Sequence, residues 1–231
     1  MISVIIPTYN EEPCIRETIQ RVWRLDEKNL VKEIIIADGG SADNTIGIAK
    51  SEGVKVISSA KGRAIQMNVA ASVATQNLLY FLHADSIPPN GFTTQILEAY
   101  KQGAKSGCFR LAFDHDHWFL KANCWFTRFN VNAVRFGDQS LFVTNEVFKN
   151  CGGFNEKLLM MEDQEIIGRI KRFGKFRVMN DYIITSARKY LDNGVYRMQG
   201  IFFRIWLLYY SGCSQDRLLQ LHRRLIRNHK L

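Results

Sequence analysis

Ile5-Ile6-Pro7-Thr8-Tyr9-Asn10-Glu11-Glu12 is the stretch that decides the fold of this chain. It joins an apolar run that begins at Ile2 to a short polar loop. Pro7 is expected to end the strand, because proline cannot donate a hydrogen bond to a sheet, and Pro13 suits the first turn of a helix. A strand, a loop and a helix in this order place polar side chains at the carboxyl end of a strand, where α/β folds bind ligands. The opening of the chain therefore predicts a ligand loop.

The bulk composition is that of one globular α/β domain. The chain has 231 residues, of which 46% are hydrophobic and 23% are charged, as is ordinary for a folded protein. The formal net charge of +9 favours anionic partners such as nucleotides, nucleic acid or an acidic membrane surface. Five scattered cysteines without a C-x-x-C pair argue against zinc or a disulfide framework and favour free thiols in a reducing cytosol.

Localisation and one class of partner follow from what the sequence lacks. Met1 leads directly into the first strand, so no signal peptide is expected. No apolar stretch reaches the roughly 20 residues that a membrane-spanning helix needs. Nucleic acid is disfavoured as a partner, because no basic cluster interleaves with stacking aromatic side chains. We therefore expect a cytoplasmic protein.

Helical and strand patterns alternate along the chain. Apolar runs at 34–37, 54–57, 78–82, 109–113 and 141–144 predict strands after the first one. Helices are predicted at 63–74 and 118–134. Two further helices are predicted because their apolar residues fall on one helical face. The first face consists of Ile15, Ile19, Val22 and Trp23, and the second, which Gly174 ends, of Ile166, Ile167, Ile170 and Phe173. Continuous apolar strands separated by helices are typical of a parallel sheet that is covered on both faces.

Polar residues stand at the ends of these strands. Asp38 precedes Gly39-Gly40-Ser41, and its carboxylate either accepts hydrogen bonds from a base or ribose or caps the turn. Lys61 and Arg63 stand at a helix start, where free N–H groups and the helix dipole favour an anion, although a solvated turn is the alternative. Asp85 follows the fourth strand and is either a turn residue or the holder of a divalent cation on a diphosphate.

Three further segments carry chemical groups. Glu162 and Asp163 open a helix; they either complement its dipole or provide a general base that deprotonates a hydroxyl. Arg188 could grip a diphosphate in bidentate fashion or lie on the surface. The run 114–117, Asp-His-Asp-His, contains metal-ligand types, but consecutive residues rarely converge on one ion. A polar turn is therefore expected there.

The order of these motifs resembles a known family. P-T-Y-N-E-E, A-D-G-G-S, K-G-R-A-x-Q-M-N, L-H-A-D-S, G-G-F, M-E-D and T-S-A-R follow one another as in family 2 glycosyltransferases of the GT-A fold. The F-G-D-Q, M-E-D and T-S-A-R set looks most like a bacterial subgroup associated with arsenosugar biosynthesis. The resemblance implies an α/β fold with a Rossmann-like nucleotide-binding half, a mixed central sheet and C-terminal helices.

The resemblance also implies an activity and a site. A sugar would pass with inversion from a nucleotide-diphosphate sugar to a hydroxyl acceptor, with Mg²⁺ or Mn²⁺. Asp85 matches the metal-binding acid, and Asp163 matches the catalytic base, with Glu162 as its neighbour. The donor would be held by Pro7, Tyr9, Glu11, Asp38, Lys61, Arg63, His83, Asp85 and Arg188. Asp138 and Gln139 are assigned to the acceptor side.

One residue departs from the family pattern. His83 stands where the family has the first acid of its D-x-D motif. A neutral histidine can ligate Mn²⁺ or hydrogen-bond ribose but supplies no negative charge. Metal binding is therefore expected to be weaker, or Arg63 and Arg188 take a larger share of the phosphate charge. This loss also motivates a second hypothesis, a non-catalytic nucleotide-binding module.

The end of the chain differs in character from the rest. Residues 1–195 are assigned to the GT-A domain and residues 196–231 to a helical extension. Ile201–Tyr210 is almost wholly apolar or aromatic, and a basic helix with an apolar face follows it. Packing of that face on the domain or on a second subunit of a homodimer is favoured over an anionic membrane. A position at the inner membrane face would instead accompany a lipid-linked acceptor, such as a polyprenyl phosphate.

Overall fold

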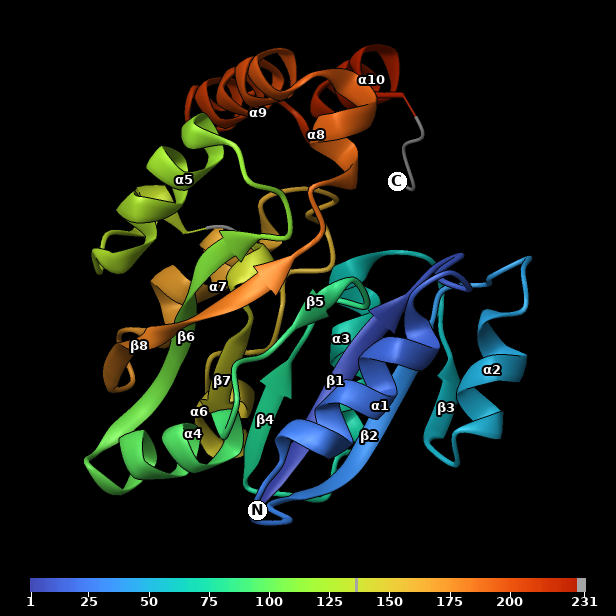
Figure 1. The fold of residues 1–231 in the computed structure, drawn as a ribbon. Coiled ribbons are helices and arrows are strands. Elements are labelled where there is room, and N and C mark those ends of the chain that lie inside the picture. Colours follow the sequence, from blue (N-terminus) through green and yellow to red (C-terminus); the bar gives the residue numbers. More distant parts are fainter. Residues whose placement is uncertain (136, 228–231) are drawn as a thin grey trace.

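A computed structural model describes residues 1–135 and 137–227 of the chain. A single twisted sheet runs through the molecule, with helices on both of its faces (Figure 1). A group of helices from the C-terminal part of the chain lies beyond one end of the strands (Figure 1). This arrangement leaves the loops at that end of the sheet beneath the C-terminal helices.

The first half of the chain alternates strands and helices, as the sequence predicts. The bounds are β1 Ile2–Thr8, α1 Ile15–Leu25, β2 Val31–Asp38, α2 Thr45–Ser51, β3 Lys55–Ser58, α3 Arg63–Ser72 and β4 Leu78–Phe81. These four strands are parallel and lie in the order β3-β2-β1-β4. Because they are parallel, their carboxyl ends meet at one edge of the sheet, which is the usual ligand edge of α/β folds.

The second half makes the sheet mixed. The bounds are β5 Ser86–Ile87, α4 Phe92–Lys101, β6 Ala104–Phe113, α5 Trp118–Trp125, the 3₁₀ turns η1 Phe126–Arg128, η2 Asn132–Val134 and η3 Gly137–Gln139, β7 Leu141–Thr144, α6 Asn145–Asn150, α7 Glu162–Ile170 and β8 Lys175–Thr185. β7 is antiparallel to both β4 and β6, whereas β8 is parallel to β6 and antiparallel to β5. The expected α/β fold with a mixed central sheet is confirmed.

Two apolar cores fill the two faces of the sheet. Buried side chains of α1, α2 and α4 pack on one face, and those of α3, α6 and α7 pack on the other. Figure 1 shows α1 and α3 on opposite sides of β1. All seven residues of β1 are buried, which explains why this strand reads as an almost unbroken apolar run.

The last helices pack on the domain. α8 Arg188–Asn193, α9 Val195–Tyr210 and α10 Gln215–Leu225 follow β8. A third apolar cluster contains Met198 and Ile205 of α9, Leu218 of α10 and Leu120 of α5. Within residues 1–135 and 137–227, no helix combines the length and the apolarity that spanning a bilayer requires. The domain boundary at 195 stays a prediction, and residues 228–231 of the expected extension lie outside the described range.

Pro7 does not end the first strand, contrary to expectation. It lies inside β1, opposite Ala37 of β2. Pairing of β1 with β4 stops at Ile5, opposite Phe81, so the missing N–H of Pro7 falls beyond the last partner on that side. Proline is tolerated where the ladder has already ended. Similarly, α1 begins at Ile15 and not at Pro13, which lies in the preceding turn.

Two expected helices are shorter than their patterns. The helix predicted at 118–134 stops at Trp125 and continues as 3₁₀ turns. The hydroxyl of Thr127 explains the break, because it donates to Cys124 O and accepts from Leu111 N of β6. The helix expected to reach Gly174 ends at Ile170. Trp23 and Phe173, both assigned to buried faces, are exposed.

Candidate active site

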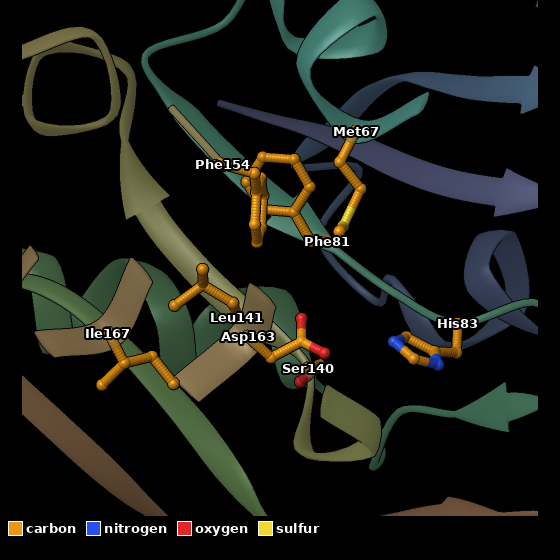
Figure 2. A pocket seen from close by; sticks show the side chains of 8 residues that line it. All are labelled: Met67, Phe81, His83, Ser140, Leu141, Phe154, Asp163 and Ile167. Atoms are coloured by element: carbon orange, nitrogen blue, oxygen red, sulfur yellow. The ribbon is translucent and has the colours of Figure 1, made fainter. Parts of the chain in front are cut away.

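The predicted site residues gather at the carboxyl edge of the parallel strands. A small pocket there is lined by Met67, Phe81, His83, Ser140, Leu141, Phe154, Asp163 and Ile167. Figure 2 shows apolar side chains at one end of this pocket, and the Asp163 carboxylate pointing toward the side on which His83 lies. Five separate segments contribute to the lining, so the pocket depends on the fold of the whole sheet.

A carboxylate pair at the start of α7 meets Arg63 from α3. Arg63 Nε lies 2.7 Å from Glu162 Oε1, and an Arg63 terminal nitrogen lies 4.0 Å from Asp163 Oδ2. Met161, the residue before α7, has a φ of +67°. This left-handed conformation is uncommon for residues other than glycine, and such residues cluster at functional sites. It sets the direction in which α7 begins, and therefore where its first two acids lie.

Glu162 is almost completely enclosed. Its side chain is 1% exposed, and in the described part of the chain Oε2 has no hydrogen-bond partner. Burial raises the pKa of Glu162, and the neighbouring charge of Asp163 adds to this effect, whereas Arg63 opposes it. For Arg63, burial acts to lower the pKa, but the charges of Glu162 and Asp163 outweigh burial and raise it. The three residues therefore form one electrostatic unit.

His83 is held by an acid from a distant loop. Its Nδ1 lies 3.2 Å from Oδ1 of Asp138, which belongs to η3. Burial acts to lower the pKa of His83, but the hydrogen bond and the charge of Asp138 raise it. For Asp138, burial acts to raise the pKa, but the hydrogen bond to His83 and the charges of His83 and Lys189 outweigh burial and lower it. The structure thus brings Asp138 to the donor-side residue His83.

Asp85 lies in the turn between β4 and β5. It follows His83 by two residues, and its backbone oxygen accepts a hydrogen bond from Ser186 N. Burial raises the pKa of Asp85, and the charge of Asp138 adds to the effect, whereas His83 and Lys189 oppose it. Asp138 therefore acts on both His83 and Asp85. The charge of Lys189 acts to lower the pKa of both Asp85 and Asp138. The sequence analysis does not predict this residue, although it directly follows the T-S-A-R motif.

Asp38 has a structural role in its loop. Its Oδ2 accepts hydrogen bonds from Gly40 N at 2.9 Å and Ser41 N at 2.8 Å. Its Oδ1 accepts from the hydroxyls of Ser41 and Thr8. The sequence analysis left two alternatives for Asp38, a turn cap and a contact with a base or ribose. The structure contains the hydrogen bonds of a turn cap. A role toward a base or ribose stays a prediction.

The opening loop carries an aromatic–cation pair. Lys61 Nζ lies 3.8 Å from the centroid of the Tyr9 ring. Glu11 Oε2 lies 3.9 Å from Arg188, which joins the first loop to the start of α8. The backbone N–H of Glu11 donates to Thr45 Oγ1 of α2 at 2.8 Å. Residues far apart in the sequence are thus fixed around one loop, as the ligand-loop hypothesis requires.

Two predicted site residues lie inside the protein framework. Pro7 is a buried strand residue, and Gln139 is buried with its amide donating to Phe109 O at 3.1 Å. Ser140, the next residue, was not predicted; it lines the pocket and has a φ of +61°. Serine gives no local signal for a left-handed conformation, so the sequence could not indicate this turn.

The donor set suits a metal that completes its coordination with other ligands. Among the described residues, no group of three or more histidine, cysteine, aspartate or glutamate side chains could hold a metal ion by itself. Mg²⁺ and related ions are often bound by one or two carboxylates together with substrate phosphates. Asp85, with its carboxylate at the ligand edge, fits that pattern. The run 114–117 has other contacts: Asp114 accepts from Ala187 N, and His117 accepts from Phe119 N.

Comparisons with known proteins agree with this fold. The structure resembles a mannosyltransferase from Pyrobaculum calidifontis in complex with GDP-Man and Mn²⁺, with a TM-score of 0.71 and 16% identity over 91% of this chain and 63% of that chain. It also resembles a glucosyl-3-phosphoglycerate synthase from Mycobacterium tuberculosis, with a TM-score of 0.63 and 18% identity over 93% of this chain and 81% of that one. These similarities show the GT-A fold.

Sequence relatives cover shorter stretches. An uncharacterized glycosyltransferase from Rickettsia typhi is 24% identical over 204 residues, which is 80% of this chain and 63% of the relative. The glucosyl-3-phosphoglycerate synthase of Mycobacterium tuberculosis is 32% identical over 100 residues, which is 38% of this chain and 30% of the relative. Three other curated relatives are longer proteins, of which the chain spans about a third or less.

A protein-family comparison covers the nucleotide-binding half and the loops of the pocket. The model of glycosyl transferase family 2 matches residues 3–155, which is more than half of the chain. The matched region holds the opening loop, Asp38, Arg63, His83 and Asp85, whereas the acids of α7 follow it. The chain therefore belongs to glycosyl transferase family 2.

Proposed function

We propose that this chain transfers a sugar from a nucleotide-diphosphate sugar to a hydroxyl acceptor, with inversion at the anomeric carbon. The observation that carries the proposal is the meeting of Arg63, Glu162 and Asp163 at the pocket that His83 also lines. Asp163 can accept the proton of the acceptor, and Asp85, which follows His83 by two residues, matches the metal-binding acid of the family motif. Homologous structures contain UDP or GDP-Man with Mn²⁺.

Asp163 is the proposed general base. As the acceptor oxygen attacks the anomeric carbon, the bond from that carbon to the diphosphate oxygen breaks, and Asp163 takes the hydroxyl proton. The leaving nucleoside diphosphate retains the electron pair. Arg63 orients the acid pair through its contacts with Glu162 and Asp163. Attack from the side opposite the leaving group gives the inverted product.

The donor is proposed to lie along the opening loop. Tyr9 and Lys61 form a platform for the base. Glu11 lies in the loop after β1 and Asp38 at the end of β2, and Arg188 faces the same loop. Asp85 would hold the divalent metal, which when bound offsets the charge of the diphosphate as the sugar leaves. Lys189 adds positive charge at the same place, because it acts on both Asp85 and Asp138.

A screen of donors tests this proposal. Thermal unfolding would be measured with UDP-, GDP-, dTDP- and ADP-sugars, each with and without Mn²⁺. A specific ligand at about 100 times its dissociation constant adds about 2.7 kcal/mol to stability. We expect one nucleotide class to raise the midpoint only when Mn²⁺ is present. If no donor shifts the midpoint, the chain does not bind nucleotide sugars and the proposal fails.

A lipid-linked acceptor is the second candidate, and a surface of exposed aromatic side chains favours it. Trp118 and Trp125 of α5 are 67% and 46% exposed, and Tyr196, Phe203 and Tyr210 of α9 are also exposed. α5 and α9 contact each other through Phe119 and Tyr196, whose ring centroids lie 5.0 Å apart. Neither α5 nor α9 contains an acidic residue, and Arg204 of α9 adds positive charge, whereas Lys121 of α5 is paired with Asp116 at 2.6 Å. Aromatic and basic side chains together are typical of membrane-interface helices.

Liposome flotation distinguishes the two acceptor classes. Vesicles with anionic lipid would be mixed with the wild type, with the double variant Trp118→Ser/Trp125→Ser, and with the control Trp23→Ser on the exposed face of α1. Binding that only the double variant loses supports a lipid-linked acceptor. A wild type that stays with the soluble fraction favours a small hydrophilic acceptor. These variants avoid truncating α9 and α10, whose apolar residues belong to the core.

Three further predictions rest on sequence alone. The resemblance to the subgroup associated with arsenosugar biosynthesis uses the F-G-D-Q motif, whose first residue, Phe136, lies outside the described residues. We propose this subgroup as the narrower class, and a cytoplasmic location and a homodimer likewise stay proposals. Activity with a panel of sugar acceptors and sedimentation analysis would test the subgroup and the dimer.

A further inference from the structure

His83 and Asp138 form a pair that the motif pattern does not predict. His83 replaces an acid at the end of β4, and Asp138 arrives from η3, 55 positions later in the chain. The sequence reasoning placed Asp138 on the acceptor side. In the structure its carboxylate lies 3.2 Å from Nδ1 of His83, and its role toward the acceptor stays a prediction. The motif lacks its first acid in the sequence, but the fold brings the carboxylate of Asp138 to the far side of the His83 ring.

This pairing leaves Nε2 as the available nitrogen of His83. A carboxylate at Nδ1 fixes the tautomer with the proton on Nδ1, so that the lone pair lies on Nε2. In the described part of the chain, the side-chain hydrogen bond of His83 is the one to Asp138, and the charges of Arg63 and Asp163 also act on the ring. The ring also lines the pocket (Figure 2). Nε2 is thus free to contact a bound group.

The arrangement matches the environment of metal-binding histidines. Such a histidine almost always donates its other ring N–H to a carboxylate or carbonyl oxygen, which fixes the ring orientation and makes the ligating nitrogen more basic. Asp85 follows two residues later, and the charges of His83 and Asp138 both act on it. A carboxylate and an imidazole are therefore close together at the strand end, with a second carboxylate behind the imidazole.

We propose that His83 Nε2 and the Asp85 carboxylate together bind the divalent cation, and that Asp138 is a positioning residue which orients His83. This inference deepens the proposed function and rests on it for the identity of the site. Two protein ligands leave the remaining coordination positions to the diphosphate and water. An imidazole ligand suits a transition metal better than it suits Mg²⁺, so the exchange of acid for histidine selects Mn²⁺ over Mg²⁺.

Electron spin-echo spectroscopy of the protein loaded with Mn²⁺ alone tests the inference. Nitrogen bound to Mn²⁺ modulates the echo, so the wild type is expected to show nitrogen modulation. His83→Asp restores the acid of the family motif; it should keep Mn²⁺ bound, lose the nitrogen modulation and bind Mg²⁺ more tightly than the wild type does. Mn²⁺-loaded wild type without nitrogen modulation would overturn the proposal, and this result requires no variant to fold.

Titration calorimetry with Mn²⁺ tests the positioning role. Asp138→Asn should weaken Mn²⁺ binding about 10- to 100-fold, which is the usual effect of removing a partner behind a ligating histidine. Asp116→Asn is the control, because it removes an exposed acid that pairs with Lys121 and lies outside the lining of the pocket, and its Mn²⁺ affinity should equal that of the wild type. Unchanged affinity in Asp138→Asn would contradict the role. Sugar transfer is not measured here, so failure of the proposed function is judged separately.

Discussion

At the residue scale, buried charge organises the site. The Glu162 side chain is enclosed, and an isolated buried carboxylate is costly unless a partner compensates it. Arg63, whose side chain is 33% exposed, provides that partner from another helix. The pair links the start of α3 to the start of α7. The stability of the protein and the orientation of Asp163 therefore depend on the same contact between Arg63 and Glu162.

Arg63→Met is expected to lower the free energy of unfolding by about 2 kcal/mol. Removing one member of a buried ion pair costs about 3–5 kcal/mol, and the partial exposure of Arg63 reduces this value. The double variant Arg63→Met/Glu162→Gln should recover most of the loss, because no unpaired charge remains. Urea unfolding of both variants provides the measurement. Equal destabilisation of the single and double variants would show that packing, and not charge, explains the effect.

Sequence reasoning found the chemical residues but not all of their partners. Asp85, Arg63 and Asp163 stand at strand ends and helix starts, and the resemblance to the family motifs assigns them to the site. The pairing of Asp138 with His83 crosses 55 positions, and no local pattern reports such a contact. The left-handed Met161 and Ser140 were also invisible, because neither residue type is selected for that conformation.

At the element scale, β6 crosses its neighbours at a position that only glycine fits. A Cβ atom built on Gly107 would lie 2.2 Å from the backbone oxygen of Arg177 on β8 and 2.5 Å from the Phe142 ring on β7. Gly107 pairs with Phe142 and Arg177 in the ladder. The close packing of these three strands therefore requires the absence of a side chain.

Gly107→Ala is expected to destabilise the protein by about 3 kcal/mol, at the upper end of the usual cost of overpacking. Gly200→Ala is the matched control, because nothing lies within 4 Å of a Cβ at that position of α9; it should stabilise the helix slightly. Thermal or urea unfolding measures both. A Gly107→Ala variant as stable as the wild type would mean that the three strands separate at little cost.

Glu33 of β2 joins β1 and the loop between α3 and β4 through one carboxylate. Its Oε1 accepts from Ser3 Oγ of β1 at 2.6 Å and from Thr75 N and Oγ1, both at 2.7 Å. Burial acts to raise the pKa of Glu33, but the hydrogen bonds from Ser3 and Thr75 and the charge of Lys55 outweigh burial and lower it. The ionised carboxylate is therefore the form that the folded protein favours.

This shift predicts the pH dependence of stability. A folded pKa below the unfolded value gives a stabilisation that is present above the ordinary glutamate pKa and is lost as the pH falls through the folded pKa. Glu33→Gln should therefore be less stable than the wild type by about 1 kcal/mol at pH 7, and the difference should shrink below about pH 4. The exposed Glu98→Gln serves as control. A difference that does not change with pH would refute the assigned cause.

The sequence predicted most elements because their hydrophobic periods are clear. The strand at 141–144 and the start of the helix at 63 agree with the structure. The helix at 118–134 was overestimated, since its apolar residues continue through 3₁₀ turns that Thr127 imposes by tertiary hydrogen bonds. Tertiary contacts of this kind override local propensity, and periodicity alone does not contain them.

At the scale of the whole molecule, the C-terminal helices complete the core. Leu218 of α10 is fully buried in the third apolar cluster, whereas Leu207 of α9 is 46% exposed. Leu218→Ala is expected to lower the free energy of unfolding by about 3 kcal/mol, and Leu207→Ala by less than about 1 kcal/mol. Urea unfolding compares them. Equal effects would mean that α10 does not pack on the domain in solution.

The central claim is that Asp163 deprotonates an acceptor hydroxyl as it attacks the anomeric carbon of a nucleotide-diphosphate sugar. Release of nucleoside diphosphate from a panel of nucleotide sugars, with water or added sugars as acceptors and Mn²⁺ present, tests it most directly. We predict that the wild type releases nucleotide from at least one donor, and that Asp163→Asn lowers the rate at least about 100-fold while its dissociation constant for that donor stays the same. Equal rates in the two proteins would contradict the account.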